Sequence, residues 1–204
     1  MWVMGLDLGQ TTDYTAVAVV QRIEEDRPWY DENKPASPPI YHVRHLERVK
    51  LGTPYPAIVA RVVEIMSTPD LSDAALVVDQ TGVGRPVVDL LRQAGLKPVP
   101  VTITGGDKPS RDADGWKVPK RDLVVTLQVL LQAERLKIAE GLPDAATLVK
   151  ELLAFKVKID AKTAHDSYET PWRDGAHDDL VLAVALATWY AERGVSRASM
   201  DSYL

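Results

Sequence analysis

Apolar residues change their spacing along the chain in a way that predicts strands first and helices later. Residues 2–9, 14–23 and 40–50 are short apolar runs, and polar or proline-rich stretches separate them. Three consecutive strands with no helix between them favour an antiparallel start to a sheet. In the first run, alternation places Trp2, Met4, Leu6 and Leu8 on one face and Val3, Gly5, Asp7 and Gly9 on the other.

From Thr53 and Pro54 onward, apolar residues recur at helical spacing. They predict a helix that includes Ile58 and Met66, one that ends near Gly95, and two more at about 119–136 and 143–154. Short apolar runs at 74–79 and 97–104 predict strands between them, and residues 155–173 are polar with β-like stretches. A last helix at about 177–192 is apolar nearly all round, which predicts that it is buried. We therefore expect an α/β fold: a mixed sheet with an antiparallel three-strand start and helices on both faces.

Composition adds mainly exclusions. The 204 residues are 46% hydrophobic and 26% charged, which predicts one globular domain over residues 1–193 and a frayed tail over 194–204. The absence of cysteine excludes a thiolate nucleophile and thiolate-bound zinc. No apolar run is long enough to span a bilayer and no basic stretch opens the chain, so we expect neither membrane association nor export. The net charge of −5 means that any nucleic-acid binding must rest on a local patch.

Two carboxylates stand at the ends of apolar runs. Asp7 ends the first predicted strand, with Gly5 and Gly9 on the same face, and those glycines leave room for a ligand or an ion to approach. Asp79 ends the run that starts at Ala74, at the kind of strand end where α/β proteins build their sites. Each Asp has an alternative interpretation as a residue that begins a turn.

A third acidic position precedes the last helix. Asp178 and Asp179 follow His177, and one Asp there is explained by helix capping and by the helix dipole. A pair of Asp residues beside a histidine, in front of so apolar a helix, is explained less well. Clustered carboxylates suit Mg²⁺ or Mn²⁺, and two such ions can activate water and stabilise a leaving oxygen in phosphodiester cleavage. Without a cation, the carboxylates would raise one another's pKa.

Three segments together resemble the nuclease domain of tailed-phage terminase large subunits. They are residues 5–16 (GLDLGQTTDYTA), 78–87 (VDQTGVGRPV) and 177–183 (HDDLVLA), and residues 118–123 and 136–139 are similar as well. The resemblance covers roughly residues 2–192. It implies a ribonuclease H-like fold and a metal-dependent endonuclease that cuts concatemeric phage DNA.

Carried over by position, the resemblance makes Asp7 the metal-bridging carboxylate and Asp79 the second ligand of two divalent cations, Mg²⁺ or Mn²⁺. The third ligand would be Asp178 or Asp179, with Asp179 favoured. Asp13 would be an accessory acidic residue, although a turn between two strands explains it better. His177 would support the site without binding the metal.

The resemblance also implies double-stranded DNA as substrate and, as partners, the ATPase motor, the small terminase subunit and the portal, in the cytoplasm of an infected or lysogenic bacterium. A packaging motor needs a phosphate loop of the form GxxxxGK[ST], and no glycine precedes a lysine anywhere in this sequence. We therefore expect an excised nuclease domain or a free-standing homologue, not the motor itself.

Basic residues that would contact DNA gather in one segment. The first predicted patch consists of Lys108, Arg111, Lys117, Lys120 and Arg121. Arg44, Arg48 and Lys50 form a second candidate, and Lys156, Lys158 and Lys162 a third. For each patch taken separately, an ordinary solvated surface is the better interpretation. Trp116, in a predicted loop, either stacks on DNA or anchors the loop, and we favour the anchor.

Three other functions fit parts of the sequence. Residues 6–12 (LDLGQTT) also resemble the first phosphate loop of sugar kinases and actin-like ATPases, but the second phosphate loop is not visible. A Holliday-junction resolvase-like nuclease would use the same fold and metals on branched DNA. A non-catalytic domain that binds DNA, the portal or a motor protein would not need the acidic positions to be intact.

Overall fold

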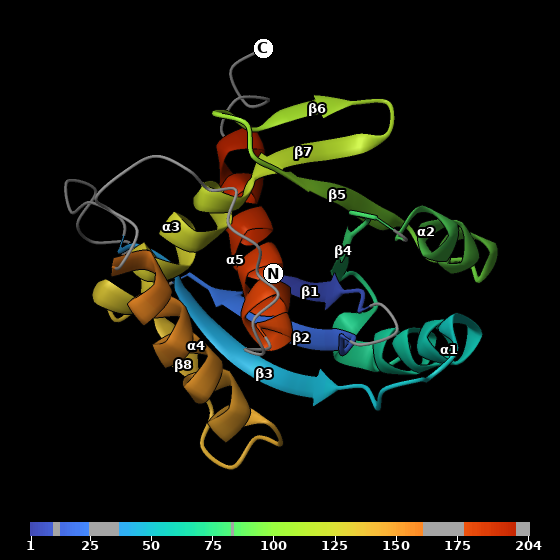
Figure 1. Cartoon of the computed structure of the whole chain (residues 1–204), viewed down its shortest axis with the longest axis horizontal. Coiled ribbons are helices and arrows are strands. Elements are labelled where there is room, and N and C mark those ends of the chain that lie inside the picture. The colour runs from blue at the N-terminus through green and yellow to red at the C-terminus, as the bar shows by residue number, and fades with distance from the viewer. Residues whose placement is uncertain (10–12, 25–36, 83, 161–177, 199–204) are drawn as a thin grey trace, which may run out of the picture.

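An eight-stranded mixed sheet forms the centre of the molecule, in the order β6-β7-β5-β4-β1-β2-β3-β8 (Figure 1). The computed structural model describes residues 1–9, 13–24, 37–82, 84–160 and 178–198. The strands are β1 (Trp2–Asp7), β2 (Ala16–Ile23), β3 (Ile40–Arg48), β4 (Ala75–Asp79), β5 (Pro98–Thr104), β6 (Ser110–Asp112), β7 (Gly115–Pro119) and β8 (Leu136–Ile138). The helices are α1 (Tyr55–Met66), a 3₁₀ turn (Pro69–Leu71), α2 (Gly84–Gln93), α3 (Lys120–Gln132), α4 (Ala145–Asp160) and α5 (Asp179–Ala198).

The sheet begins as the sequence predicts. β1 pairs antiparallel with β2, and β2 antiparallel with β3. β4 then adds parallel to the other side of β1, followed by β5 and β7, also parallel. This order brings the carboxyl ends of β1, β3, β4, β5 and β7 to one edge of the sheet, where α/β proteins commonly place their functional residues.

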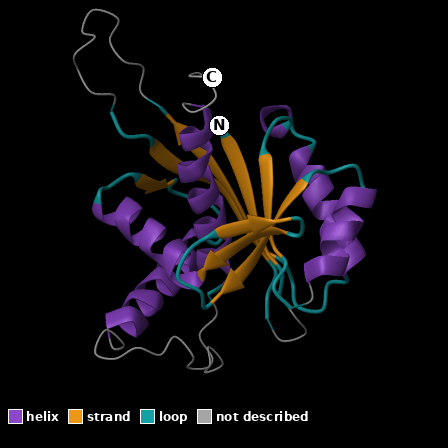
Figure 2. Ribbon diagram, turned by 90° about the horizontal axis from the view of Figure 1, so that it is seen from above, coloured by secondary structure: helices purple, strands orange, loops and turns teal. Residues whose placement is uncertain are grey.

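Helices cover both faces of the sheet, as predicted (Figure 2). Met4, Leu6 and Leu8 of the first apolar run pack with α1 and α2 in one core cluster. Val3 packs in a second cluster, with α3, α4 and α5. The predicted division of the first strand into two faces is therefore confirmed.

Helix α5 lies directly against the central strands β1 and β2, which explains why it is apolar nearly all round. A methyl group built on Gly5 would stand 2.0 Å from the carbonyl oxygen of Ala183, so only glycine lets the helix come this close. α5 continues to Ala198, past its predicted end at 192 and into the predicted tail; residues 199–204 lie outside the described residues. Within the described residues, no helix has both the length and the apolar composition that crossing a membrane requires.

Three local predictions are wrong. The predicted helix over 119–136 ends at Gln132, because Glu134 takes a φ of +55° and the chain then joins β3 as the short strand β8. Trp116 lies on β7, not in a loop: Asp112 Oδ1 accepts a hydrogen bond from the Asp114 N–H and closes a β6–β7 hairpin that the sequence analysis missed. Similarly, residues 155–160 continue α4 as helix, while 161–173 lie outside the described residues.

Candidate active site

Asp7 and Asp79 are neighbours at the carboxyl edge of the sheet. β1 and β4 are parallel and adjacent, with Leu6 opposite Val78, so each strand delivers its last residue to the same place. Asp7 is 8% exposed and Asp79 is 9% exposed. Two carboxylates this deeply buried need compensation from cations or hydrogen bonds.

The glycines beside Asp7 serve the protein itself, not a ligand. Gly5 is covered by the backbone of α5 at Ala183. At Gly9, an added methyl group would stand 2.2 Å from the carbonyl oxygen of Asp13, in the turn that leads to β2. The expectation that these two glycines leave room for a ligand is therefore wrong, because backbone already fills that space.

Asp79 also has the turn-forming role that its position favours. Its Oδ1 accepts hydrogen bonds from the Thr81 N–H at 2.8 Å and from the Thr81 hydroxyl at 2.5 Å. The same hydroxyl accepts the Ile103 N–H, which ties this turn to β5. The two interpretations of Asp79 are thus compatible: one carboxylate oxygen holds the turn while the group remains at the cluster.

The amino terminus of α5 brings the third acidic position to this edge. Asp178 is half-buried and its carbonyl oxygen accepts the Leu182 N–H, which makes it the residue that precedes the helix. Asp179 is the first helical residue and is 6% exposed. Both carboxylates act electrostatically on Asp7, and Asp179 has the larger effect.

A buried pair that the sequence analysis did not place at the site holds this end of α5. Glu151 of α4 is 5% exposed, and its Oε2 accepts hydrogen bonds from the Leu180 and Val181 N–H groups at 3.0 and 3.1 Å. Its Oε1 lies 2.7 Å from Nη2 of Arg48, and the same nitrogen lies 3.3 Å from Oδ2 of Asp179. The signal for Glu151 was an acidic residue between Leu148 and Leu152, on the apolar side of a predicted helix.

Burial dominates the electrostatics of the cluster. The pKa of Asp7 is raised well above its ordinary value, first by burial and then by repulsion from Asp79, Asp179 and Asp178. Burial also raises the pKa of Asp79, against the lowering effects of its Thr81 hydrogen bonds and of Lys120. Burial raises the pKa of Glu151 from 4.5 to about 7, although Arg48 opposes the shift. Mutual repulsion, which the sequence analysis emphasised, is thus the second cause at Asp7.

These carboxylates are near one another without forming a closed ligand shell. Among the described residues, no three Asp, Glu or His side chains are arranged to hold a metal ion as they stand. Two of their oxygens have protein partners: Oδ1 of Asp79 accepts from Thr81, and Oδ2 of Asp179 accepts from Nη2 of Arg48. The donor set itself, carboxylate oxygens at a buried edge, has the chemistry that Mg²⁺ and Mn²⁺ prefer.

Comparison with solved structures decides the fold. The nuclease of the large terminase from the thermophilic phage G20c superposes with a TM-score of 0.56 at 20% identity, over 92% of this chain and 80% of that one. The human cytomegalovirus terminase nuclease domain gives a TM-score of 0.46 at 14% identity, over 92% and 82% of the two chains. This chain has the terminase nuclease fold. No protein-family model matches the sequence, and no curated protein is significantly similar to it.

Within the terminase nuclease fold, the first predicted DNA-binding patch spreads over the β6–β7 hairpin and the start of α3. Lys108, Arg111, Lys117 and Arg121 are exposed, and acidic neighbours pair with two of them: Lys117 with Asp112, and Arg121 with Asp107 and Asp122. Their binding to DNA stays a prediction.

Lys120 differs from the rest of the patch. It is half-buried at the first position of α3, directly after β7, and its charge lowers the pKa of both Asp7 and Asp79. The sequence predicts Lys120 as part of the DNA-binding patch. The terminase nuclease fold brings it to the carboxylate cluster as well, because β7 ends at the same edge as β4.

The second basic patch is divided. Arg44 is exposed and contacts Gln21. Arg48, in contrast, points into the protein toward Glu151 and Asp179, so its assignment to a DNA-binding surface is wrong. Asp13 is exposed in the turn before β2, outside the buried cluster. His177 lies outside the described residues.

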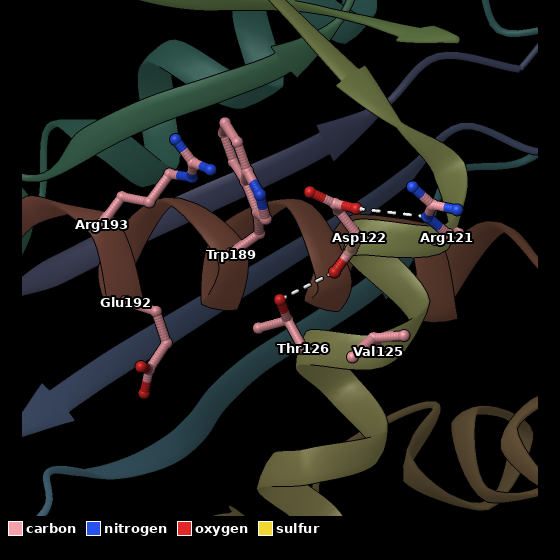
Figure 3. A pocket seen from close by; sticks show the side chains of 7 residues that line it. All are labelled: Arg121, Asp122, Val125, Thr126, Trp189, Glu192 and Arg193. Carbon is pink, nitrogen blue, oxygen red and sulfur yellow. Dashed lines mark hydrogen bonds and ion pairs between the residues drawn. The ribbon is translucent and has the colours of Figure 1, made fainter. Parts of the chain in front are cut away.

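A separate cavity of about 400 Å³ lies between α3 and α5 (Figure 3). Its lining comprises Arg121, Asp122, Val125, Thr126, Trp189, Glu192 and Arg193. Asp7, Asp79, Asp178 and Asp179 do not line it. Trp189 also meets Trp116 edge-to-face, with ring centroids 5.6 Å apart at 84°, which favours the anchor interpretation of Trp116.

Proposed function

We propose that this chain is a metal-dependent DNA endonuclease of terminase type that hydrolyses phosphodiester bonds with two divalent cations, Mg²⁺ or Mn²⁺. One observation carries the proposal. Asp7 and Asp79, at the ends of adjacent parallel strands, share one buried edge with Asp179 at the start of α5, on a terminase nuclease fold. Buried carboxylates with raised pKa values favour binding of a cation, which relieves both desolvation and repulsion.

Each acidic residue has a proposed role that follows from its position. Asp79, Asp179 and Asp178 all raise the pKa of Asp7, and Asp7 would hold both cations. Asp79 and Asp179 would each bind one of them, and Asp178, as the residue before the helix, would stay beside the site. When bound, the cations would activate water and stabilise the leaving oxygen.

Lys120 has a place in the same proposal. Its ammonium group is near enough to lower the pKa of both Asp7 and Asp79, and it would hold a scissile phosphate beside them by charge. The exposed basic residues of the first patch would contact the DNA backbone at a distance from the reaction. Their contacts would be salt-sensitive and weakly selective for sequence.

The fold and the resemblance support a proposed biological setting. The substrate would be concatemeric viral double-stranded DNA, cut during genome packaging in a bacterial host. The ATPase motor, the small terminase subunit and the portal would be the partners. Products would carry 5′-phosphate and 3′-hydroxyl ends.

A plasmid assay tests the activity. Supercoiled plasmid is incubated with the protein in Mn²⁺, Mg²⁺ or EDTA, beside Asp7→Asn and the matched control Asp70→Asn, which changes an exposed Asp of the 3₁₀ turn. We expect metal-dependent nicking and linearisation by the wild type and by Asp70→Asn, and none by Asp7→Asn. A four-way junction offered beside linear duplex separates a resolvase from a terminase-type nuclease.

Two results would overturn the proposal. Cleavage that persists in EDTA would exclude the metal-dependent reaction. Absence of cleavage in either metal by a protein whose circular dichroism shows it to be folded would exclude autonomous nuclease activity, and the DNA-binding or portal-binding alternative would replace it.

A further inference from the structure

Arg48 occupies a specific place relative to the carboxylate cluster. It is the last residue of β3, and the strand register aligns it with Ala16 of β2 and, through Ala16, with Asp7 of β1. Residues aligned across neighbouring strands project from the same face of a sheet. The small side chain of Ala16 separates Arg48 from Asp7, so the long Arg48 side chain crosses above β2 toward the start of α5.

The guanidinium group of Arg48 is fixed from three directions. Nη2 is 2.7 Å from Glu151 Oε1 and 3.3 Å from Asp179 Oδ2. The guanidinium carbon stands 4.3 Å from the ring centroid of Tyr14, within cation–π distance. The Arg48 backbone N–H donates to Asp144 at the start of α4, which fixes the strand end as well.

Glu151 connects this guanidinium to the helix. One of its carboxylate oxygens binds Arg48, and the other accepts the Leu180 and Val181 N–H groups in the first turn of α5. The same turn begins with Asp179. The Arg48–Glu151 ion pair thus contacts both the side chain of Asp179 and the backbone of the two residues that follow it.

We propose that Arg48 is a positioning residue for the metal site: held by Glu151 and Tyr14, it fixes the Asp179 carboxylate at the edge occupied by Asp7 and Asp79. This inference rests on the proposed function. It also favours Asp179 over Asp178 as the third ligand, because Arg48 contacts Asp179. Arginine suits this task because its planar guanidinium also lies over the Tyr14 ring while Nη2 contacts both carboxylates, whereas a lysine ammonium has no planar face to stack there.

Binding of Mn²⁺ to the full chain tests the role of Arg48 without relying on turnover. Isothermal titration calorimetry would compare the wild type with Arg48→Gln and Arg48→Lys. The matched control is Arg61→Gln, which removes another arginine paired with β3, through Glu47, away from the cluster. Loss of a residue that orients a metal ligand weakens metal binding by about tenfold to a hundredfold.

We expect Arg48→Gln to bind Mn²⁺ at least about tenfold more weakly, Arg48→Lys to remain weaker than the wild type, and Arg61→Gln to be unchanged. Urea unfolding in EDTA checks that each variant is folded. If Arg48→Gln does not fold, Arg48→Lys alone tests the inference. Wild-type affinity in either Arg48 variant would overturn the inference, and so would tighter binding, which would make Arg48 a competitor of the metal. A wild type that neither binds Mn²⁺ nor cleaves DNA would overturn the proposed function as well, so the two failures are distinguishable.

Discussion

Replacing Glu151 by glutamine tests whether the desolvation of this buried carboxylate or its ion pair with Arg48 has the larger effect on stability. Burial raises the pKa of Glu151 from 4.5 to about 7, despite the Arg48 guanidinium 2.7 Å away. Between these two pH values the folded protein holds a proton that the unfolded chain has released. The folding stability associated with this group is therefore complete below pH 4.5 and is lost as the pH rises through about 7.

The size of this loss follows from the shift. A change from 4.5 to about 7 corresponds to about 3 kcal/mol of unfolding free energy, and solvent near the sheet edge reduces it to about 2–3 kcal/mol. Glutamine is always neutral; its carbonyl oxygen still accepts the Leu180 and Val181 N–H groups, and its amide NH2 takes the place that the protonated oxygen of neutral Glu151 has beside Arg48. We expect Glu151→Gln to match the wild type at pH 4.5 and to be more stable by about 2–3 kcal/mol at pH 8.

Urea unfolding in EDTA at several values between pH 4.5 and 8 measures the difference. Glu47→Gln is the matched control, because Arg61 lowers the pKa of Glu47 by hydrogen bonding and the sign reverses. The stability from Glu47 is present above its unfolded pKa and is lost as the pH falls, so this variant should be less stable at neutral pH. A Glu151→Gln protein that is less stable than the wild type at pH 8 would show that the ion pair outweighs desolvation, and the reasoning would fail.

Two further changes test the packing around the site. Gly5→Ala would bring a methyl group to 2.0 Å from the Ala183 carbonyl oxygen, so we expect urea unfolding to show a free energy of unfolding lower by about 3 kcal/mol or more. In the control Gly105→Ala the space around the new methyl group is open, so its stability should be unchanged. Equal stability of the two variants would contradict this account. Trp116→Ala removes the edge-to-face contact with Trp189 and should lower stability by about 2 kcal/mol and weaken the near-ultraviolet circular dichroism. If Trp116 is an anchor, plasmid cleavage by the folded variant should persist, and loss of DNA binding without loss of stability would indicate stacking on DNA instead.

Much of the fold could be predicted because burial leaves a periodic trace in the sequence. The alternation in residues 2–9 correctly separated the face of Met4 and Leu6 from the face of Val3. The all-apolar last helix correctly indicated a helix buried against the sheet. The β6–β7 hairpin left a weaker trace, since Ser110, Arg111 and Asp112 are all exposed and show no apolar alternation. Asp114-Gly115 was the usable turn signal there.

The candidate site was predictable where it depends on strand ends, and not where it depends on contacts between distant segments. Asp7 and Asp79 could be paired because parallel strands end together. Arg48 and Glu151 are 103 positions apart, and no spacing rule connects them. The glycines near Asp7 were misinterpreted for the same reason. The space at Gly5 is filled by the backbone of α5, a segment far away in the sequence.

The two ends of the sheet also bear on how the protein behaves at high concentration. Its outermost strands, β6 and β8, are three residues each, and they carry Arg111, Asp112 and Lys137. A long, flat, apolar edge strand can pair with the edge strand of another molecule through its free backbone N–H and C=O groups. Short charged edge strands offer few such hydrogen bonds, and pairing would bury their charges. Strands β1, β2 and β4, whose residues are mostly buried and apolar, are all internal, and β8 pairs with Tyr41–Val43 of the nine-residue strand β3. Self-association through strand pairing should therefore require prior unfolding, so a native preparation should stay free of β-aggregates until its unfolding temperature is approached.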